Sequence, residues 1–268
     1  MRRLAVRRWR LRHFPACPRG PWSIPEAREK FDLFLLMGQS NMAGFGCIRA
    51  DDPWQADDFD PVPGVLVLGG QAKLKDSKRR GSIRWRPASH PLHLNQRSAG
   101  FGLGLPFAVE LRKETPGHSV GLIPCAWGGA PIQSLGPGSP SFQNTVRRAR
   151  YAERFGVLRA VLWHQGETDA LDPADSAAHA DRLRGLMHAM RGELDQPDLP
   201  FLIGDLAEPT RPNIDHERVR QGLRAVAEED RGSRFVEAAG LEKVDSVHFG
   251  RDALIEFGRR YAQAWRQR

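Results

Sequence analysis

The sequence is poor in cysteine, which limits how the fold can be stabilised. Only three cysteines, Cys17, Cys47 and Cys125, occur among 268 residues. Three scattered thiols are too few for a disulfide framework or a cysteine-rich zinc site. A chain of this length can bury a substantial core without cross-links, and its 40% hydrophobic and 27% charged residues are ordinary for a globular domain.

Long apolar runs are also missing. No stretch approaches the roughly 20 apolar residues that a membrane-spanning helix needs, so we predict no membrane span. Residues 1–30 are rich in arginine, but no apolar run of signal-peptide length follows, which favours a cytoplasmic location over secretion. We expect 1–30 to be a poorly ordered basic extension, either an arm or surface-binding tail or the product of a misread start codon. Residues 31–268 are expected to form a single domain.

Positive charge is in excess only at one end of the chain. The formal net charge is +8, and the first twelve residues hold six arginines and no acid. Subtracting these six leaves +2 for the other 256 residues. A nucleic-acid-binding protein should carry a basic stripe on its folded surface. We therefore predict no nucleic-acid partner, and the sequence does not indicate an oligomeric state.

Short apolar runs alternate with segments of helical periodicity, which predicts an α/β fold with a mostly parallel central sheet. The expected strands are 31–37, 65–68, 120–124, 158–163, 201–206 and 234–237, and the expected helices are 101–113, 176–194, 213–229 and 251–266. The stretches 50–64 and 69–97 fit neither pattern. We interpret both as loops that wall the active site at the carboxyl ends of the strands, where sites lie in such folds, and ordinary surface loops are an equally good interpretation.

A serine directly follows the first apolar strand, in the segment GQSNMAG at 38–44. If a helical turn begins there, backbone N–H groups and the helix dipole face Ser40. That environment suits a nucleophile that forms an oxyanion. A serine that merely caps a helix is an equally good interpretation of this segment alone.

A second segment, VDSVHF at 244–249, lies just before the last helix and supplies a base. A nucleophilic serine needs a neighbouring histidine, and the histidine needs a carboxylate on its other ring nitrogen. Asp245, three residues before His248, can fold back to that nitrogen. A capping aspartate beside a surface histidine is the alternative.

Two further segments follow predicted strands. CAWGGAP at 125–131 contains Gly128 and Gly129, whose backbone N–H groups can approach a ligand closely, although glycine pairs are also common in plain turns. WHQGETDA at 163–170 offers Gln165 as a further N–H donor and Glu167 as an acid near the base. Its histidine and acids also permit a metal site, but no His-Glu-x-x-His motif occurs and no other histidine shows ligand spacing.

Taken together, these segments resemble those of the SGNH (GDSL-like) hydrolase superfamily. They are most similar to the sialate O-acetylesterase-like domain and to carbohydrate esterase family six, which includes acetylxylan esterases. The resemblance extends from about residue 31 to the C-terminus. It implies a three-layer, flavodoxin-like α/β/α fold, no metal or other cofactor, and an acetyl ester of a small molecule or oligosaccharide as substrate.

The resemblance also implies roles for individual residues. Ser40 is the expected nucleophile, His248 the general base and Asp245 its orienting acid, with Glu167 as the alternative acid or an organiser of its loop. The expected oxyanion donors are Ser40, Gly128, Gly129 and Gln165, and the expected substrate contacts are Gln39, Asn41 and His164. The activity implied is serine-dependent deacetylation of a carbohydrate. A short-chain lipase or thioesterase, a metal-dependent hydrolase and a non-catalytic carbohydrate-binding protein are the alternatives.

Overall fold

The computed structural model describes residues 23–45, 55–69, 83–94, 96, 98–210 and 212–268. Its strands are β1 Phe31–Gly38, β2 Val65–Gly69, β3 Arg84–Pro87, β4 Ser119–Pro124, β5 Val157–His164, β6 Phe201–Gly204 and β7 Arg234–Val236. Its α-helices are α2 Ser40–Ala43, α3 Gly104–Arg112, α4 Ile132–Leu135, α5 Pro140–Ala152, α6 Pro173–Glu193, α7 Ile214–Glu229 and α8 Arg251–Arg266. Short 3₁₀ helices occur at η1 Arg28–Lys30, η3 Ala56–Phe59 and η4 Asp169–Leu171.

The strands form one seven-stranded sheet in the order β3-β2-β4-β1-β5-β6-β7. All neighbouring pairs are parallel except β2 and β3, which are antiparallel. Strand β1 lies at the centre, between β4 and β5. The carboxyl ends of the parallel strands therefore share one edge, on which the segments after β1, β4, β5 and β6 converge.

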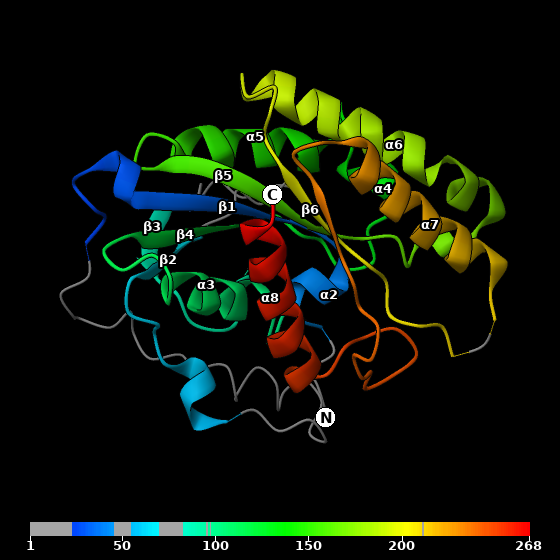
Figure 1. The fold of residues 1–268 in the computed structure, drawn as a ribbon, viewed down its shortest axis with the longest axis horizontal. Helices are drawn as coiled ribbons and strands as arrows, with labels where there is room; N and C mark the ends of the chain where they lie inside the picture. Colours follow the sequence, from blue (N-terminus) through cyan, green and yellow to red (C-terminus); the bar gives the residue numbers. More distant parts are fainter. Residues whose placement is uncertain (1–22, 46–54, 70–82, 95, 97, 211) are drawn as a thin grey trace, which may run out of the picture.

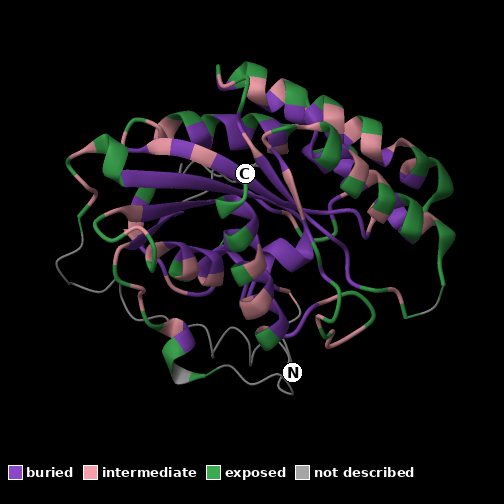
Figure 2. Ribbon diagram, viewed as in Figure 1, coloured by how far each residue is buried: buried purple, intermediate pink, exposed green. Residues whose placement is uncertain are grey.

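Helices cover both faces of the sheet, so the fold has the three layers expected (Figure 1). Strand β1 illustrates this arrangement, because its successive side chains point to opposite faces of the sheet and pack into two separate hydrophobic clusters. Leu33 and Leu35 belong to the cluster that packs under α5, α6 and α7, whereas Phe34 and Leu36 belong to the cluster under α3 and α8. The strand is buried along its whole length, as Figure 2 shows for the centre of the sheet. Burial on both faces explains its almost wholly apolar sequence.

All six predicted strands and all four predicted helices are confirmed, with small shifts at their ends. The sequence missed β3, which lies in the stretch 69–97 that was expected to be a loop. It is a four-residue antiparallel edge strand with alternating arginines, so it lacks the apolar signal of the inner strands. It also missed α5, whose buried face is interrupted by the almost fully buried Arg148.

Residues 1–22 lie outside the described residues, and the prediction for them stays untested. The described end of the extension, 23–30, contacts the domain. Arg28 lies in η1 and its Nε donates a 2.7 Å hydrogen bond to the backbone carbonyl of Glu153, while Ile24 packs against the core. In the described part of the chain, no helix is both long and apolar enough to cross a bilayer.

Candidate active site

The end of β1 is anchored to the strands on both sides of it. The backbone N–H of Gln39 donates to the carbonyl of His164 in β5, and the N–H of Trp127, after β4, donates to the carbonyl of Gly38, both at 2.9 Å. Gly38 has φ +131°, and a Cβ atom there would lie 1.9 Å from the His164 carbonyl oxygen. Only glycine allows this conformation and this close approach. The chain can therefore turn sharply and present the next residues at the sheet edge.

Ser40 is the first residue of α2, and Gln39 rather than Ser40 occupies the N-cap position. The interpretation of Ser40 as a helix-capping serine is therefore wrong. As a first-turn residue, Ser40 has a backbone N–H without an intrahelical partner. The turn closes at Gly44, whose N–H donates to the Ser40 carbonyl at 2.8 Å.

Asn41 holds the serine turn against the segment that carries the histidine. Its Nδ2 donates to the Val247 carbonyl at 2.9 Å, and its Oδ1 accepts from the Phe249 N–H at 3.1 Å. The two backbone neighbours of His248 are thus fixed to the residue next to Ser40. Asn41 Nδ2 also donates to Glu167 Oε1 at 2.6 Å. Asn41 therefore holds the site together through its amide, and a substrate contact of Asn41 stays a prediction.

His248 is paired with Asp245, as the sequence spacing predicts. The His248 Nδ1–H lies 2.9 Å from Asp245 Oδ2 and 3.1 Å from Oδ1. Oδ1 also accepts the backbone N–H groups of Val247 at 2.9 Å and His248 at 2.8 Å. Burial alone would raise the Asp245 pKa, but these hydrogen bonds outweigh it and lower the pKa to about 2. The ionised carboxylate accepts only, so it keeps the proton on Nδ1 and leaves Nε2 as the basic nitrogen.

Glu167 has a different position from Asp245. Its Oε1 accepts from Asn41, and the same oxygen lies 3.6 Å from His164 Nδ1. Within the described residues, no hydrogen bond joins Glu167 to His248, and none joins Ser40 to His248. Hydrogen bonds between catalytic groups are often long without substrate. In the structure, Asp245 therefore pairs with His248, whereas Glu167 accepts a hydrogen bond from Asn41.

Of the two glycines after β4, only one presents a free N–H. The Gly128 N–H donates to Gln96 Oε1 at 2.8 Å, and Gln96 Nε2 donates to the Ala126 carbonyl. The Gly128 N–H is therefore occupied, contrary to its expected role as an oxyanion donor. Gly129 is exposed, has φ +67°, and its N–H has no hydrogen-bond partner in the described part of the chain. Sequence reasoning missed Gln96, which lies in the polar stretch that no motif covers.

The side-chain amide of Gln165, a predicted oxyanion donor, has its partners inside the protein in this structure. It is fully buried, and its Nε2 donates to the Ala130 carbonyl at 3.1 Å and to Asp169 Oδ2. Its Oε1 accepts from His179 Nε2–H at 2.9 Å. The amide instead ties the loop after β5 to the loop that carries Gly129.

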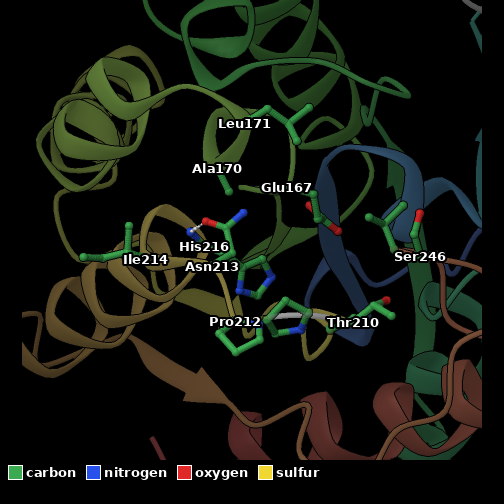
Figure 3. A pocket seen from close by; sticks show the side chains of 12 residues that line it. Glu167, Ala170, Leu171, Thr210, Pro212, Asn213, Ile214, His216 and Ser246 are labelled. Carbon is green, nitrogen blue, oxygen red and sulfur yellow. Dashed lines mark hydrogen bonds between the residues drawn. The ribbon is translucent and has the colours of Figure 1, made fainter.

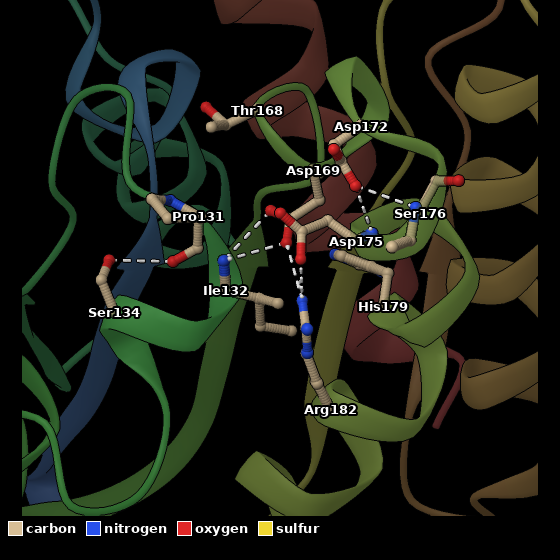
Figure 4. A network of polar contacts seen from close by, with 12 residues as sticks. Pro131, Ile132, Ser134, Thr168, Asp169, Asp172, Asp175, Ser176, His179 and Arg182 are labelled. Atoms are coloured by element: carbon tan, nitrogen blue, oxygen red, sulfur yellow. Dashed lines mark hydrogen bonds and ion pairs between the residues drawn. The ribbon is translucent and has the colours of Figure 1, made fainter.

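Asp169 also links the loop after β5 to the segment that follows Gly129, through its hydrogen bond with Ile132 (Figure 4). Its Oδ2 accepts the Ile132 N–H at 3.0 Å, and Arg182 Nη1 lies 3.9 Å from Oδ1. Burial raises the pKa of Asp169 and lowers the pKa of His179 to about 4, which leaves His179 neutral near pH 7. No motif in the sequence pointed to His179 or Arg182, because both lie on a helix whose spacing indicates only packing.

Two other residues that were predicted to contact substrate, His164 and Gln39, have their partners inside the protein. His164 is fully buried, its Nε2 lies 3.0 Å from the Asp205 carbonyl, and the rings of Phe249 and Phe257 pack edge-on against it. It cannot contact substrate, so that prediction is wrong. Gln39 Oε1 lies 3.4 Å from the N–H groups of Gly166 and Thr168. A substrate contact through the Gln39 amide nitrogen stays a prediction.

The histidine and the acids after β5 that would permit a metal site, His164, Glu167 and Asp169, have other partners. His164 lies against the Asp205 carbonyl, Glu167 accepts from Asn41, and Asp169 accepts from Ile132. Among the described residues, no group of three histidine, cysteine, aspartate or glutamate side chains has an arrangement that could hold a metal ion.

Comparison with known proteins now places the chain in a family. The model of the family described as "Carbohydrate esterase, sialic acid-specific acetylesterase" matches residues 30–267. The chain belongs to this family. The match begins at the first residues of β1 and ends at α8, so it includes every segment of the site.

Relatives of known structure have the same fold. A protein of Arabidopsis thaliana named a "probable carbohydrate esterase" is 33% identical over 247 residues, which is 87% of this chain and 89% of the relative. An X-ray structure of an Arabidopsis thaliana protein has a TM-score of 0.77 at 28% identity and covers 88% of this chain and 98% of that one. A carbohydrate acetylesterase from Xanthomonas citri has a TM-score of 0.64 at 18% identity, over 88% of this chain and 56% of that one.

Proposed function

We propose that this member of the carbohydrate esterase family is a serine-dependent O-acetylesterase that removes acetyl groups from a carbohydrate. The observation that supports this most directly is the His248–Asp245 pair, held to the Ser40 turn by the Asn41 amide. A histidine with an ionised acid on Nδ1, and with no hydrogen-bond partner on Nε2 among the described residues, is a suitable base for a serine hydroxyl. The description of the family, which names an acetylesterase, supports acetyl esters as the substrate class.

In the first half of the reaction, His248 Nε2 takes the proton from Ser40 Oγ while Oγ bonds to the acetyl carbonyl carbon. The carbonyl oxygen becomes an oxyanion. The protonated His248 then gives this proton to the sugar oxygen as the carbon–oxygen bond of the ester breaks. The alcohol leaves, and the acetyl group remains on Ser40.

In the second half, His248 takes a proton from water as the water oxygen attacks the acetyl carbon. The bond to Ser40 Oγ breaks, the proton returns to Oγ, and acetate leaves. Asp245 stays ionised throughout and stabilises the imidazolium in both halves. The backbone N–H groups of Ser40 and Gly129 are the oxyanion donors in this proposal, since the Gly128 N–H and the side-chain amide of Gln165 are engaged elsewhere.

Labelling with a fluorophosphonate, combined with turnover of an aryl acetate, tests this function. The wild type should be labelled stoichiometrically and lose activity, whereas Ser40→Ala should take no label and lose nearly all turnover. Unchanged turnover in Ser40→Ala would exclude the serine mechanism. Absent turnover and labelling in the wild type would favour a non-catalytic carbohydrate-binding protein, and loss of activity with a chelator would favour a metal-dependent hydrolase.

A further inference from the structure

A cavity of about 560 Å³ lies beside the site, between the loops that follow β5 and β6 and the loop that carries His248. Its wall includes Leu171, Pro209, Pro212, Ile214 and Val247. Figure 3 shows Ile214 and Ser246 on opposite sides of it, with Glu167 between them and Leu171 above (Figure 3). The volume is within the range of small-molecule pockets and far exceeds that of an acetyl group.

The wall carries most of the exposed apolar side chains that the structure describes. Among the described residues, five large apolar side chains are exposed, and three of them line this cavity. Leu171 is 81% exposed, Ile214 75% and Val247 37%. Exposed apolar side chains that gather around one hollow indicate a binding surface.

The polar residues of the wall are largely engaged within the protein. Asn213 Oδ1 accepts the N–H groups of Asp215 and His216 at the start of α7. Glu167 Oε1 accepts from Asn41, the Thr210 hydroxyl accepts from Lys243 Nζ at 3.4 Å, and Glu167 Oε2 and His216 Nδ1 have almost no exposed surface. The cavity therefore offers a ligand mainly apolar contacts.

The cavity wall is hydrogen-bonded to the catalytic segments. Asn41, the residue after Ser40, donates to Glu167 and to Val247, and both of these form part of the wall. The loops after β5 and β6 lie on one side of β1, whereas Gly129 follows β4 on the other side. If the oxyanion faces Gly129, a different substituent of the ester carbonyl carbon, either the acyl group or the alcohol portion, must face the cavity.

The position of His248 decides which substituent this is. His248 must give its proton to the departing alcohol oxygen, so that oxygen lies against the 245–248 segment. Ser246 and Val247 of the same segment form part of the cavity wall. The cavity is thus positioned for the alcohol portion of the ester.

We propose that this cavity is a subsite for an apolar group on the alcohol portion of the substrate, such as an alkyl or aryl aglycone of an acetylated sugar. This inference rests on the proposed esterase function and adds to it a substrate class. A bound acetylated sugar that lacked an apolar substituent would make no contact with Leu171 and Ile214 in the cavity wall.

Two matched ester series test the proposal. One is ethyl, butyl and hexyl acetate, and the other is ethyl butanoate and ethyl hexanoate, which add methylenes on the acyl side instead. In the acetate series, kcat/KM should rise about three- to fourfold for each methylene that becomes buried. It should not rise in the acyl series.

Ile214→Asp tests the wall directly, because Ile214 is exposed and is the first residue of α7, where an acidic side chain favours the helix. We expect the hexyl-to-ethyl acetate ratio of kcat/KM to fall about tenfold, since a charge replaces an apolar contact. Val109→Asp is the control, because Val109 is exposed on α3 and does not line the cavity. Its ratio should equal that of the wild type.

The outcomes separate this proposal from the esterase function. Ethyl acetate turnover with a flat acetate series would overturn the subsite and leave the esterase function standing. A rise only in the acyl series would assign the cavity to the acyl group and overturn the proposal. No turnover of any ester would remove the esterase function and this inference with it.

Discussion

The side-chain amide of Asn41 donates a 2.9 Å hydrogen bond to the backbone carbonyl of Val247, 206 residues away in the sequence. The Asn41 carbonyl oxygen accepts from Phe249 at 3.1 Å, so one amide fixes both neighbours of His248. A single side chain therefore joins the serine turn to both backbone neighbours of the catalytic histidine. Asn41 is a positioning residue in this arrangement.

Replacing Asn41 should impair the reaction more than binding. In Asn41→Ala, we expect kcat to fall about 100-fold with little change in KM, because small errors in placing the base are costly. The rate of fluorophosphonate labelling should fall in parallel. Asn41→Asp should be at least as impaired, because it sets a carboxylate 2.6 Å from Glu167. Activity close to wild type in both variants would show that the histidine loop holds its position without the amide.

Gln165→Ala distinguishes a structural amide from an oxyanion donor. Removing the amide deletes one buried hydrogen bond each from Ala130, Asp169 and His179, which should destabilise the fold by roughly 1–3 kcal/mol. We therefore expect a lower thermal midpoint. Gln221→Ala, at an exposed position of α7, should leave that midpoint unchanged. A kcat loss of about 10²–10³ with an unchanged midpoint would instead restore Gln165 as an oxyanion donor.

The two acids of the site should differ strongly in their effect on kcat. Asp245→Asn should lower kcat by about 10⁴, because an asparagine no longer fixes the required tautomer of His248. Glu167→Gln should have a much smaller effect, since its contacts go to Asn41 and lie near His164. A larger loss in Glu167→Gln than in Asp245→Asn would reverse this assignment of the acid.

The sequence predicted the inner sheet well because buried parallel strands have a strong apolar signal. The strand at 31–37 and its neighbours needed no long-range information. By contrast, β3 is held by pairing with β2, and α5 keeps Arg148 buried through a 2.6 Å bond to the Leu68 carbonyl. Such contacts between distant segments leave no local pattern.

The site shows the same division. The Asp245–His248 pair could be predicted because three residues of spacing allow the contact directly. The engagement of Gln165 and Gly128 could not be predicted, because their partners His179 and Gln96 lie in segments without motifs. The order of motifs along the chain therefore does not show which of their polar side chains face the substrate.

The depressed pKa of Asp245 predicts how stability depends on pH. Its pKa is about 2 in the folded chain against an ordinary 3.8, so the ionised form favours folding above about pH 4. This contribution is lost as the pH falls from about 4 to 2. The stability difference between the wild type and Asp245→Asn should therefore not shrink between about pH 8 and 5, and should shrink below about pH 4. Urea unfolding at each pH measures it, and a decline that begins near pH 6 would contradict the low pKa.

Gly38→Ala should be the most damaging of these substitutions for the fold, although it adds only one methyl group. That methyl would lie 1.9 Å from the His164 backbone carbonyl oxygen, and φ of +131° is unfavourable for alanine. Neither strand can move, because β1 and β5 are both buried at the centre of the sheet. Gly240→Ala is the matched control, since Gly240 also has positive φ, +76°, but its Cβ would meet nothing within 4 Å. We expect a loss of about 1–2 kcal/mol in the control and a larger loss, or no soluble protein, in Gly38→Ala. Equal unfolding free energies for the two variants would show that the turn before Ser40 can relax, and the fixed placement of Ser40 at the sheet edge would then need another cause.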